Sequence, residues 1–341
     1  MSYTDMIINN YAIQTKSIKP SFASYRATNP ITRMPASTDF YHDYPTLKES
    51  VRLLEQNFPE GCDILVYAGS NGEEAISIYS MLQHPERYNI HSIDPFKEAI
   101  NTAQKGIFRV GYAAEDNFLI LNNSNDIQHR EQRACFKKCF IPVEKIDPYS
   151  GKVSMKTLGY IFEAIQNMGI EELFLLKPEV KERINFVEGD IRNIDSFKTQ
   201  KPVGAVFFRN ALYHLTHNNI MDTDGFSPDY GINRRKILKN LMDSVDRKLS
   251  PNGIFVMGHH LQEHMYLADP QTSFAHTKLF GPFRVVDYPL NIKALEENGH
   301  FVRKFVRDIT EASDNNKAVN QMMKMHIPFS VEIPLIWQKI R

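Results

Sequence analysis

ILVYAGSNGEEAISIYSML, residues 64–82, is the stretch that decides the fold. It begins as a short apolar run, breaks at a turn that contains Gly69 and Gly72, and continues through two acids into a pattern of helical period. An apolar strand, a glycine turn and a helix in this order form the first unit of a parallel sheet covered by helices. The turn also lies where such sheets bind ligands, outside the carboxyl end of a strand.

Predicted strands and helices alternate on both sides of this stretch. Leu47, Val51, Leu54 and Phe58 recur at steps of three and four and predict a helix over 44–58. Residues 112–182 interrupt this alternation of strands and helices, which resumes after them. We therefore expect an N-terminal arm at 1–45 and one doubly wound α/β domain at 46–341, with an insertion at 112–182. The expected strands are 63–67, 89–94, 184–187, 205–208, 254–257, 301–306 and 333–340, and the main helices 73–83, 234–249 and 292–297.

The composition bounds the functional class. Forty basic residues balance forty acidic ones in a chain of 341, so no bulk field favours nucleic acid or an anionic membrane. No apolar run is long enough to span a bilayer, and the first residues lack a signal-peptide pattern. Three cysteines are too few for a disulfide framework. The expectation is a cytoplasmic protein that binds no nucleic acid and does not insert into a membrane.

Acidic residues follow successive predicted strands and indicate the ligand. The turn at 69–74 lacks the G-x-G-x-x-G spacing of a dinucleotide site, and its two acids would repel phosphate. S-adenosylmethionine carries an amine and a sulfonium but no phosphate. Glu74 could pair with its ammonium, Asp94 could accept both ribose hydroxyls, and Asp190 could meet the adenine amine. Ordinary helix capping remains the alternative for Glu73 and Glu74.

Several stretches also resemble one known family in the right order. These stretches are STDFYHD, NGEEAISIYSML followed by the strand ending in Asp94, INTAQKGIFRV, VGAVFFRNALYHL and LSPNGIFVMGHH. They resemble the chemotaxis-receptor (CheR-type) methyltransferases over about residues 37–262. The resemblance implies a class I methyltransferase-like fold, S-adenosylmethionine as cofactor, and methylation of glutamate side chains of proteins. The implied cofactor-binding residues are Thr38, Gly69, Glu74, Asp94, Asp190, Ile191, Arg209 and Asn210.

Departures from the family pattern concern the methyl acceptor. His42 stands where the family has an arginine, and His214, beside Tyr213, stands where it has a tyrosine. The segment before the core is also shorter than the family's receptor-docking domain, and the insertion is longer than the family's small β-subdomain and unlike it in sequence. We expect Asn210, His214 and His42 at the reaction centre. A neutral histidine there could act as a base toward an N–H or O–H acceptor, or the histidines could only pack. The acceptor stays open between a protein and a small molecule.

Two other readings compete with the methyltransferase. His260, Glu263 and His264 match the H-x-x-E-H pattern of zinc peptidases, but they follow a predicted strand and not a helix, so no metal is expected there. Cys135, Cys139 and His129 do not have the spacing of a standard metal site. The remaining reading is a non-catalytic binding or scaffold protein that keeps the fold. The loop at 217–231 has the composition of a segment that covers or selects an acceptor.

Overall fold

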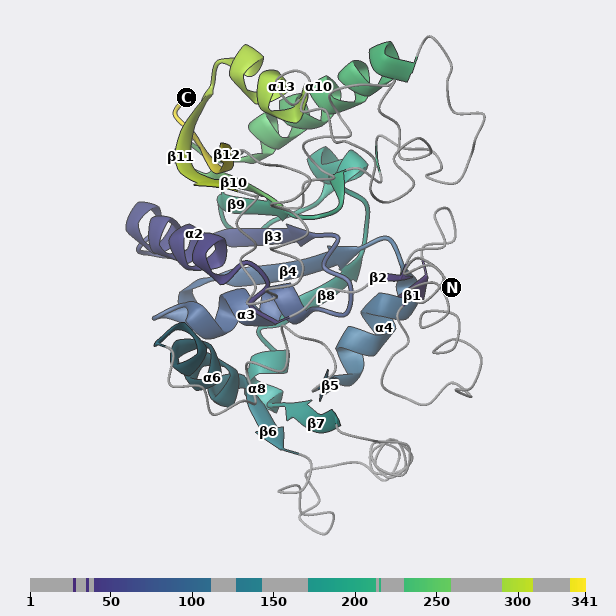
Figure 1. Cartoon of the computed structure of the whole chain (residues 1–341), viewed down its shortest axis with the longest axis vertical. Coiled ribbons are helices and arrows are strands. Elements are labelled where there is room, and N and C mark those ends of the chain that lie inside the picture. Colours follow the sequence, from purple (N-terminus) through teal and green to yellow (C-terminus); the bar gives the residue numbers. More distant parts are fainter. Residues whose placement is uncertain are drawn as a thin grey trace, which may run out of the picture.

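The main sheet has seven strands (Figure 1). The computed structural model describes residues 27–28, 35–36, 40–111, 127–142, 171–212, 215, 230–258, 290–308 and 332–341. Within them the sheet is ordered β11-β12-β10-β9-β3-β4-β8. Its strands are β3 (Asp63–Tyr67), β4 (Asn89–Asp94), β8 (Ile184–Glu188), β9 (Val203–Phe208), β10 (Ile254–Met257), β11 (Phe301–Asp308) and β12 (Glu332–Lys339).

The order of these strands identifies the fold class. Neighbouring strands from β8 to β10 are parallel, and β12 is antiparallel to both β10 and β11, between which it lies. In chain order this is 3-2-1-4-5-7-6, a doubly wound sheet whose order reverses between β3 and β9. The observed sheet confirms the predicted α/β fold of class I methyltransferase type. Every strand that the apolar pattern predicted for this sheet is present.

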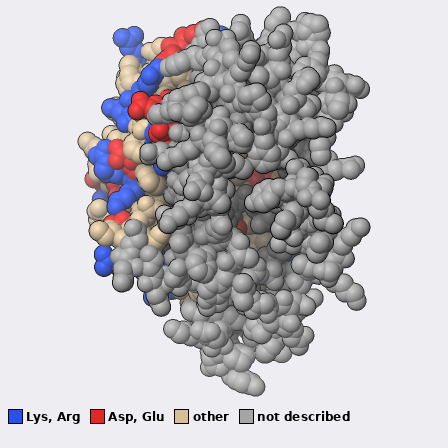
Figure 2. All heavy atoms as spheres, viewed as in Figure 1, with Lys and Arg blue, Asp and Glu red and all other residues tan. Residues whose placement is uncertain are grey.

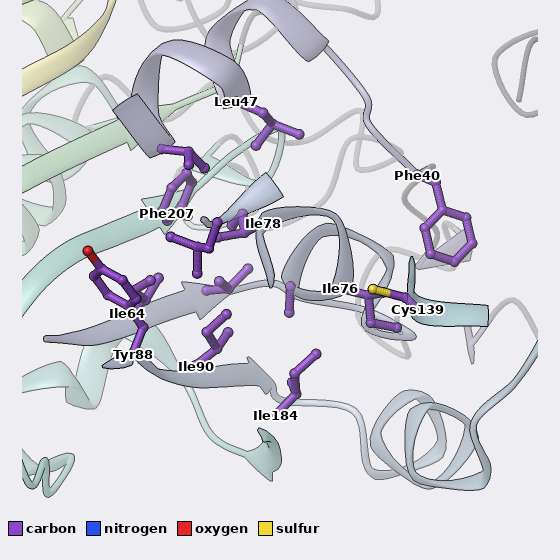
Figure 3. Close-up of a cluster of buried hydrophobic side chains, with 14 of the residues drawn as sticks. Phe40, Leu47, Ile64, Ile76, Ile78, Tyr88, Ile90, Cys139, Ile184 and Phe207 are labelled. Atoms are coloured by element: carbon purple, nitrogen blue, oxygen red, sulfur yellow. The ribbon is translucent and has the colours of Figure 1, made fainter. Parts of the chain in front are cut away.

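Alternating side chains explain why the sheet carries helices on both faces. Ile64 and Val66 of β3 belong to one buried cluster, and Leu65 and Tyr67 belong to the other. The first cluster includes side chains of α2 (Tyr44–Asn57), α3 (Glu73–Met81) and α4 (Lys97–Lys105). Figure 3 shows its isoleucines converging from the strands and from α3. The second cluster includes α10 (Tyr230–Lys248) and α13 (Leu290–Asn298).

The predicted insertion contributes a second, smaller sheet. The strands β5 (Ile107–Gly111), β7 (Glu171–Leu176) and β6 (Phe140–Pro142) pair antiparallel in that order, and α6 (Ile127–Cys139) leads into β6. This sheet begins at Ile107, before the predicted boundary at 112, and neither it nor α6 was predicted. The helix that the sequence suggested near 155–168 lies outside the described residues.

Aromatic rings join the insertion to the segment that precedes α2. Phe40 makes edge-to-face contacts with Phe108, Phe136 and Phe140, with ring centroids 5.3–5.5 Å apart. Figure 3 shows Phe40 beside Cys139, at the far side of α3 from Leu47. Such pairs stabilise beyond the area they bury, so residues just before α2 are tied to the insertion. Of the N-terminal arm, the structure describes two short paired strands, β1 (Ala27–Thr28) and β2 (Pro35–Ala36).

The described surface carries charges of both signs, in agreement with the balanced composition of the sequence. On the described part of the face shown in Figure 2, Lys and Arg side chains lie among Asp and Glu. Such mixing produces no extended field of one sign on that part. Every helix in the described ranges is too short or too polar to cross a membrane.

Candidate functional site

The turn after β3 has a strained backbone. Ala68, Ser70 and Gly72 all have positive φ, at 55°, 49° and 97°. For Ala68 and Ser70 this conformation costs on the order of 1–3 kcal/mol each, and such residues cluster at functional sites. Only glycine fits at two places here. A side chain on Gly69 would collide with Ser92 of β4, and one on Gly72 would collide with the ring of Phe186 of β8.

Asp94, the last residue of β4, lies against this turn. Its carboxylate accepts hydrogen bonds from the backbone N–H of Ser70 and of Phe96, each at 2.9 Å. Only 3% of the residue is exposed. Burial raises the pKa of Asp94 to about 6, although the two N–H donors act in the opposite direction. The structure thus holds a carboxylate that titrates near neutrality at the carboxyl end of the central strands.

Backbone hydrogen bonds bring the ends of three strands together. Gly69 N–H donates to Ile93 O at 3.1 Å, and Gly189 N–H donates to Asp94 O at 3.0 Å. Around this junction, Ser70 Oγ, Asn71 Oδ1 and Ser92 Oγ are buried and lack a hydrogen-bond partner in the described part of the chain. Buried polar atoms are nearly always paired, so this group of unpaired atoms suits a polar ligand.

Arg209 follows β9 and forms a buried ionic network. Its Nη1 donates to Glu74 Oε2 at 2.8 Å and its Nη2 donates to the backbone oxygen of His42 at 2.8 Å. The same Nη2 lies 3.7 Å from Asp43 Oδ2, and Asp43 Oδ1 also binds Arg307 of β11. Side-chain exposure is 1% for Arg209, 0% for Asp43 and 9% for Glu74. The sequence predicted Glu74 as a partner of the ammonium, and here it is also the partner of an arginine.

The other predicted residues that the structure describes follow β8 or β9 or precede α2. Asn210 has a φ of 55° and His42 is half-buried, both next to residues of the network. Asp190 caps the 3-10 helix η3 (Ile191–Ser196) by accepting from Arg192 N–H at 2.8 Å, and it also pairs with the Arg192 guanidinium. Burial raises the pKa of Asp190, but the bonds to Arg192 lower it by more than burial raises it, so the pKa lies below its usual value. Ile191 is buried in the second cluster.

Several sequence hypotheses lie outside the described residues: Thr38, His214, the H-x-x-E-H stretch at 260–264, and 217–229 of the cover loop. Where the chain is described, no group of three His, Cys, Asp or Glu side chains could hold a metal ion. Cys139 is buried, and burial raises the pKa of its thiol to about 12.

The structure adds residues that the sequence pattern missed. Asp43 and Arg307 complete the network from 166 and 98 positions away from Arg209, by the difference of their residue numbers. Asp43 ends the STDFYHD stretch, but it also precedes a helix, where an aspartate usually serves as a cap, and it was therefore not predicted as a site residue. Ser92 also escaped notice because it lies within a strand. Only its burial without a hydrogen-bond partner in the described chain marks it.

Comparisons with known proteins give distant structural likenesses only. No protein-family model and no curated protein matches the chain. Similar solved structures include the N-methyltransferase NodS from Bradyrhizobium japonicum in complex with S-adenosylhomocysteine, at 11% identity and a TM-score of 0.39, covering 93% of this chain and 95% of that one. A putative rRNA methylase from Clostridium thermocellum has 13% identity and a TM-score of 0.36, covering 87% and 96%. Because these scores are low, the fold is assigned from the strand order itself.

Proposed function

We propose that the chain is an S-adenosylmethionine-dependent methyltransferase. The observation that carries the proposal is Asp94, a buried carboxylate at the end of the second strand, oriented by N–H groups of Ser70 and Phe96. In a doubly wound sheet this position faces the ligand crevice. Each carboxylate oxygen keeps a further lone pair, so Asp94 can accept two hydroxyl groups of a ribose side by side.

The surrounding residues fit the rest of this cofactor. In the part of the chain that the structure describes, Ser70 Oγ and Asn71 Oδ1 lack a hydrogen-bond partner. They belong to the turn whose Ser70 N–H binds Asp94, and they suit the polar ends of the ligand. Gly69 and Gly72 let the turn pack against β4 and β8 without side chains. The turn carries no lysine, and the acids Glu73 and Glu74 begin α3, which favours an ammonium group over a phosphate.

The chemistry requires little of the protein beyond placement. When bound, the cofactor supplies a methyl group that the adjacent sulfonium has already activated. Asp94 and the turn at 69–72 would fix the cofactor, and Asn210 would face the reacting side, since it lies two residues beyond the end of β9. Orienting the acceptor in line with the methyl group and excluding water account for most of the rate that such a site can supply.

The finer proposal is a CheR-like enzyme that acts on a protein carboxylate. Its support is the ordered set of motifs from STDFYHD to LSPNGIFVMGHH and the three-stranded antiparallel sheet within the insertion, a place where that family has a small β-subdomain. A carboxylate acceptor needs no base. His42, which replaces the family arginine, would instead suit an N–H or O–H acceptor as a base.

Calorimetric titration with S-adenosylmethionine tests the proposal. We expect the wild type to bind and Asp94→Ala to bind at least about a hundredfold more weakly. Each lost hydrogen bond to a charged acceptor is worth about 1.5–3 kcal/mol, and two are lost. If the wild type does not bind at millimolar ligand, the proposal fails and a scaffold protein becomes the better reading.

Transfer of a labelled methyl group then separates the acceptor classes. The wild type is incubated with labelled cofactor and a set of protein and small-molecule acceptors, and the product is treated with mild alkali. A methyl ester releases volatile methanol, whereas an N-methyl or O-methyl ether product keeps its label. Volatile label supports the protein-carboxylate proposal, and stable label favours a histidine-assisted transfer.

A further inference from the structure

We propose that Asp43 is a positioning residue for the cofactor site. It acts through Arg209, which it holds against Glu74 and next to Asn210. The identity of the ligand rests on the proposed function, but the positioning itself does not. The claim is that a buried acid outside the crevice sets the geometry of two groups inside it.

The helix that follows Asp43 does not explain this residue. Asp43 occupies the N-cap position of α2, where an aspartate normally accepts a hydrogen bond from the first turn. Its side chain makes no capping bond, and its backbone is left-handed, with φ 52° and ψ 58°. The carboxylate is instead fully buried and directed at two arginines. A residue that leaves its usual partner and adopts a strained backbone points to a role elsewhere.

Among the described residues, the positive and negative charges of this network are equal in number when Asp43 is included. Arg209 and Arg307 contribute two positive charges, and Glu74 and Asp43 contribute two negative ones. Taking ions out of water is expensive, and a buried network is retained when its geometry is specific. Arg209 would otherwise have one carboxylate and one backbone oxygen for its planar, forked guanidinium. Asp43 fixes the orientation of that fork by lying beside Nη2.

The short turn at 40–43 also connects the site to three other parts of the chain. Phe40 packs on the aromatic rings of the insertion. Tyr41 N–H donates to Ser77 Oγ at 2.9 Å, which ties the turn to α3. The His42 backbone oxygen accepts from Arg209, and Asp43 binds Arg307 of β11. Besides Arg209, the turn therefore contacts the insertion, the helix α3 that carries Glu74, and the strand β11 at the edge of the sheet.

Removing the charge of Asp43 should loosen the site more than it loosens the fold. For Asp43→Asn we expect the Kd for S-adenosylmethionine to rise about tenfold, within the range of about 5- to 150-fold typical of coupled sites. Arg307→Gln, which breaks the same pair from the other side, should shift the Kd in the same direction. Asp43→Glu keeps the charge and should recover part of the affinity.

Asp63→Asn is the matched control. Asp63 is equally buried and lies at the opposite end of β3, where it holds backbone N–H groups of Gln200 and Lys201. It should lower stability to urea yet leave the Kd within about twofold, because its partners lie away from the crevice. If Asp43→Asn lowers stability but leaves the Kd unchanged, as this control does, the positioning role is refuted.

Hydrogen exchange of the ligand-free protein gives a readout that needs no cofactor. Asp43→Asn should speed exchange at 73–77 and 208–211 relative to the rest of the sheet, whereas Asp63→Asn should not. If the wild type does not bind S-adenosylmethionine, the proposed function fails, and exchange alone decides the positioning role. Unchanged exchange at both segments would overturn it.

Discussion

Two buried aspartates lie at opposite ends of neighbouring strands and differ in what surrounds them. Asp63 begins β3, and its carboxylate accepts from Asn89 Nδ2 at 2.6 Å and from the backbone N–H of Gln200 at 2.7 Å and Lys201 at 3.2 Å. Asp94 ends β4 and, within the described part of the chain, accepts from two backbone N–H groups, beside a strained turn and several polar atoms that lack a hydrogen-bond partner there.

Burial of an acidic side chain does not by itself identify a functional site. At the amino end, three donors satisfy the carboxylate and fasten a loop to the sheet. Among the described residues, left-handed backbone and several unpaired oxygens accompany the acid at the carboxyl end, which is the end where we propose that the ligand binds.

The largest expected effect concerns the charges at the carboxyl end. Arg209→Met leaves Glu74 and Asp43 as buried carboxylates without their shared cation, and we expect a loss of about 3–5 kcal/mol in the free energy of unfolding in urea. Arg247, which pairs with Asp195 at 2.6 Å on the surface, provides the control. Arg247→Met should leave stability unchanged, because water screens exposed pairs. Equal losses in both variants would contradict the assignment of a buried network.

The next effect concerns the amino end. Asp63→Asn replaces an acceptor of three hydrogen bonds by an amide whose NH₂ faces a donor, so we expect a loss of about 1–3 kcal/mol in stability. Urea unfolding measures the loss, and calorimetry with S-adenosylmethionine shows whether binding is spared. Weaker binding in this variant would remove the functional distinction between the two ends.

The smallest effect is the pH dependence of binding. Since the pKa of Asp94 is raised to about 6, the carboxylate becomes protonated below that pH and loses acceptor capacity. We expect the Kd for S-adenosylmethionine to rise about fivefold between pH 6 and pH 5, because the ionised fraction of Asp94 falls from about one half to about one eleventh. Calorimetry from pH 5 to pH 8 measures the profile, and residual binding by Asp94→Ala should lack this inflection. A wild-type profile that is flat over this range would exclude Asp94 as the ionised acceptor.

The raised pKa of Asp94 also determines how its contribution to the free energy of unfolding changes with pH. A carboxyl group whose folded pKa lies above its unfolded value of about 3.9 stabilises the fold only while it is protonated. The contribution of Asp94 to the free energy of unfolding should thus be present below about pH 4 and lost as the pH rises through 6. Comparing urea unfolding of the wild type and Asp94→Ala across this window isolates the contribution.

Local patterns in the sequence predicted the main sheet because most of its strands are apolar and buried. The ends of β3 and β10 were predicted at the observed residues, and Asp94 was predicted at a strand end. The helix α6 was missed because its buried side has helical spacing but mixed chemistry, with His129 and Gln132 preceding Phe136 and Cys139. Apolar periodicity detects such a helix poorly.

The small sheet and the ionic network were not predicted for a different reason: their contacts join residues that are far apart in the sequence. β5 pairs with β7 across more than fifty residues, and Arg209 meets Glu74 across 135 positions. No local spacing encodes such contacts, since they depend on how the whole chain returns upon itself. The sequence therefore predicted that Asp94 ends a strand and that Glu74 lies at the start of a helix, but not that Glu74 would pair with an arginine.

The position of β12 has a consequence for the order in which the molecule can fold. β11 reaches the main sheet only through β12, which lies between it and β10. During synthesis β11 emerges before β12, and until 332–339 are available it has no partner strand within this sheet. The segment FVRKFVRD then carries an unpaired edge, and its three basic residues at 303, 304 and 307 discourage pairing with other chains.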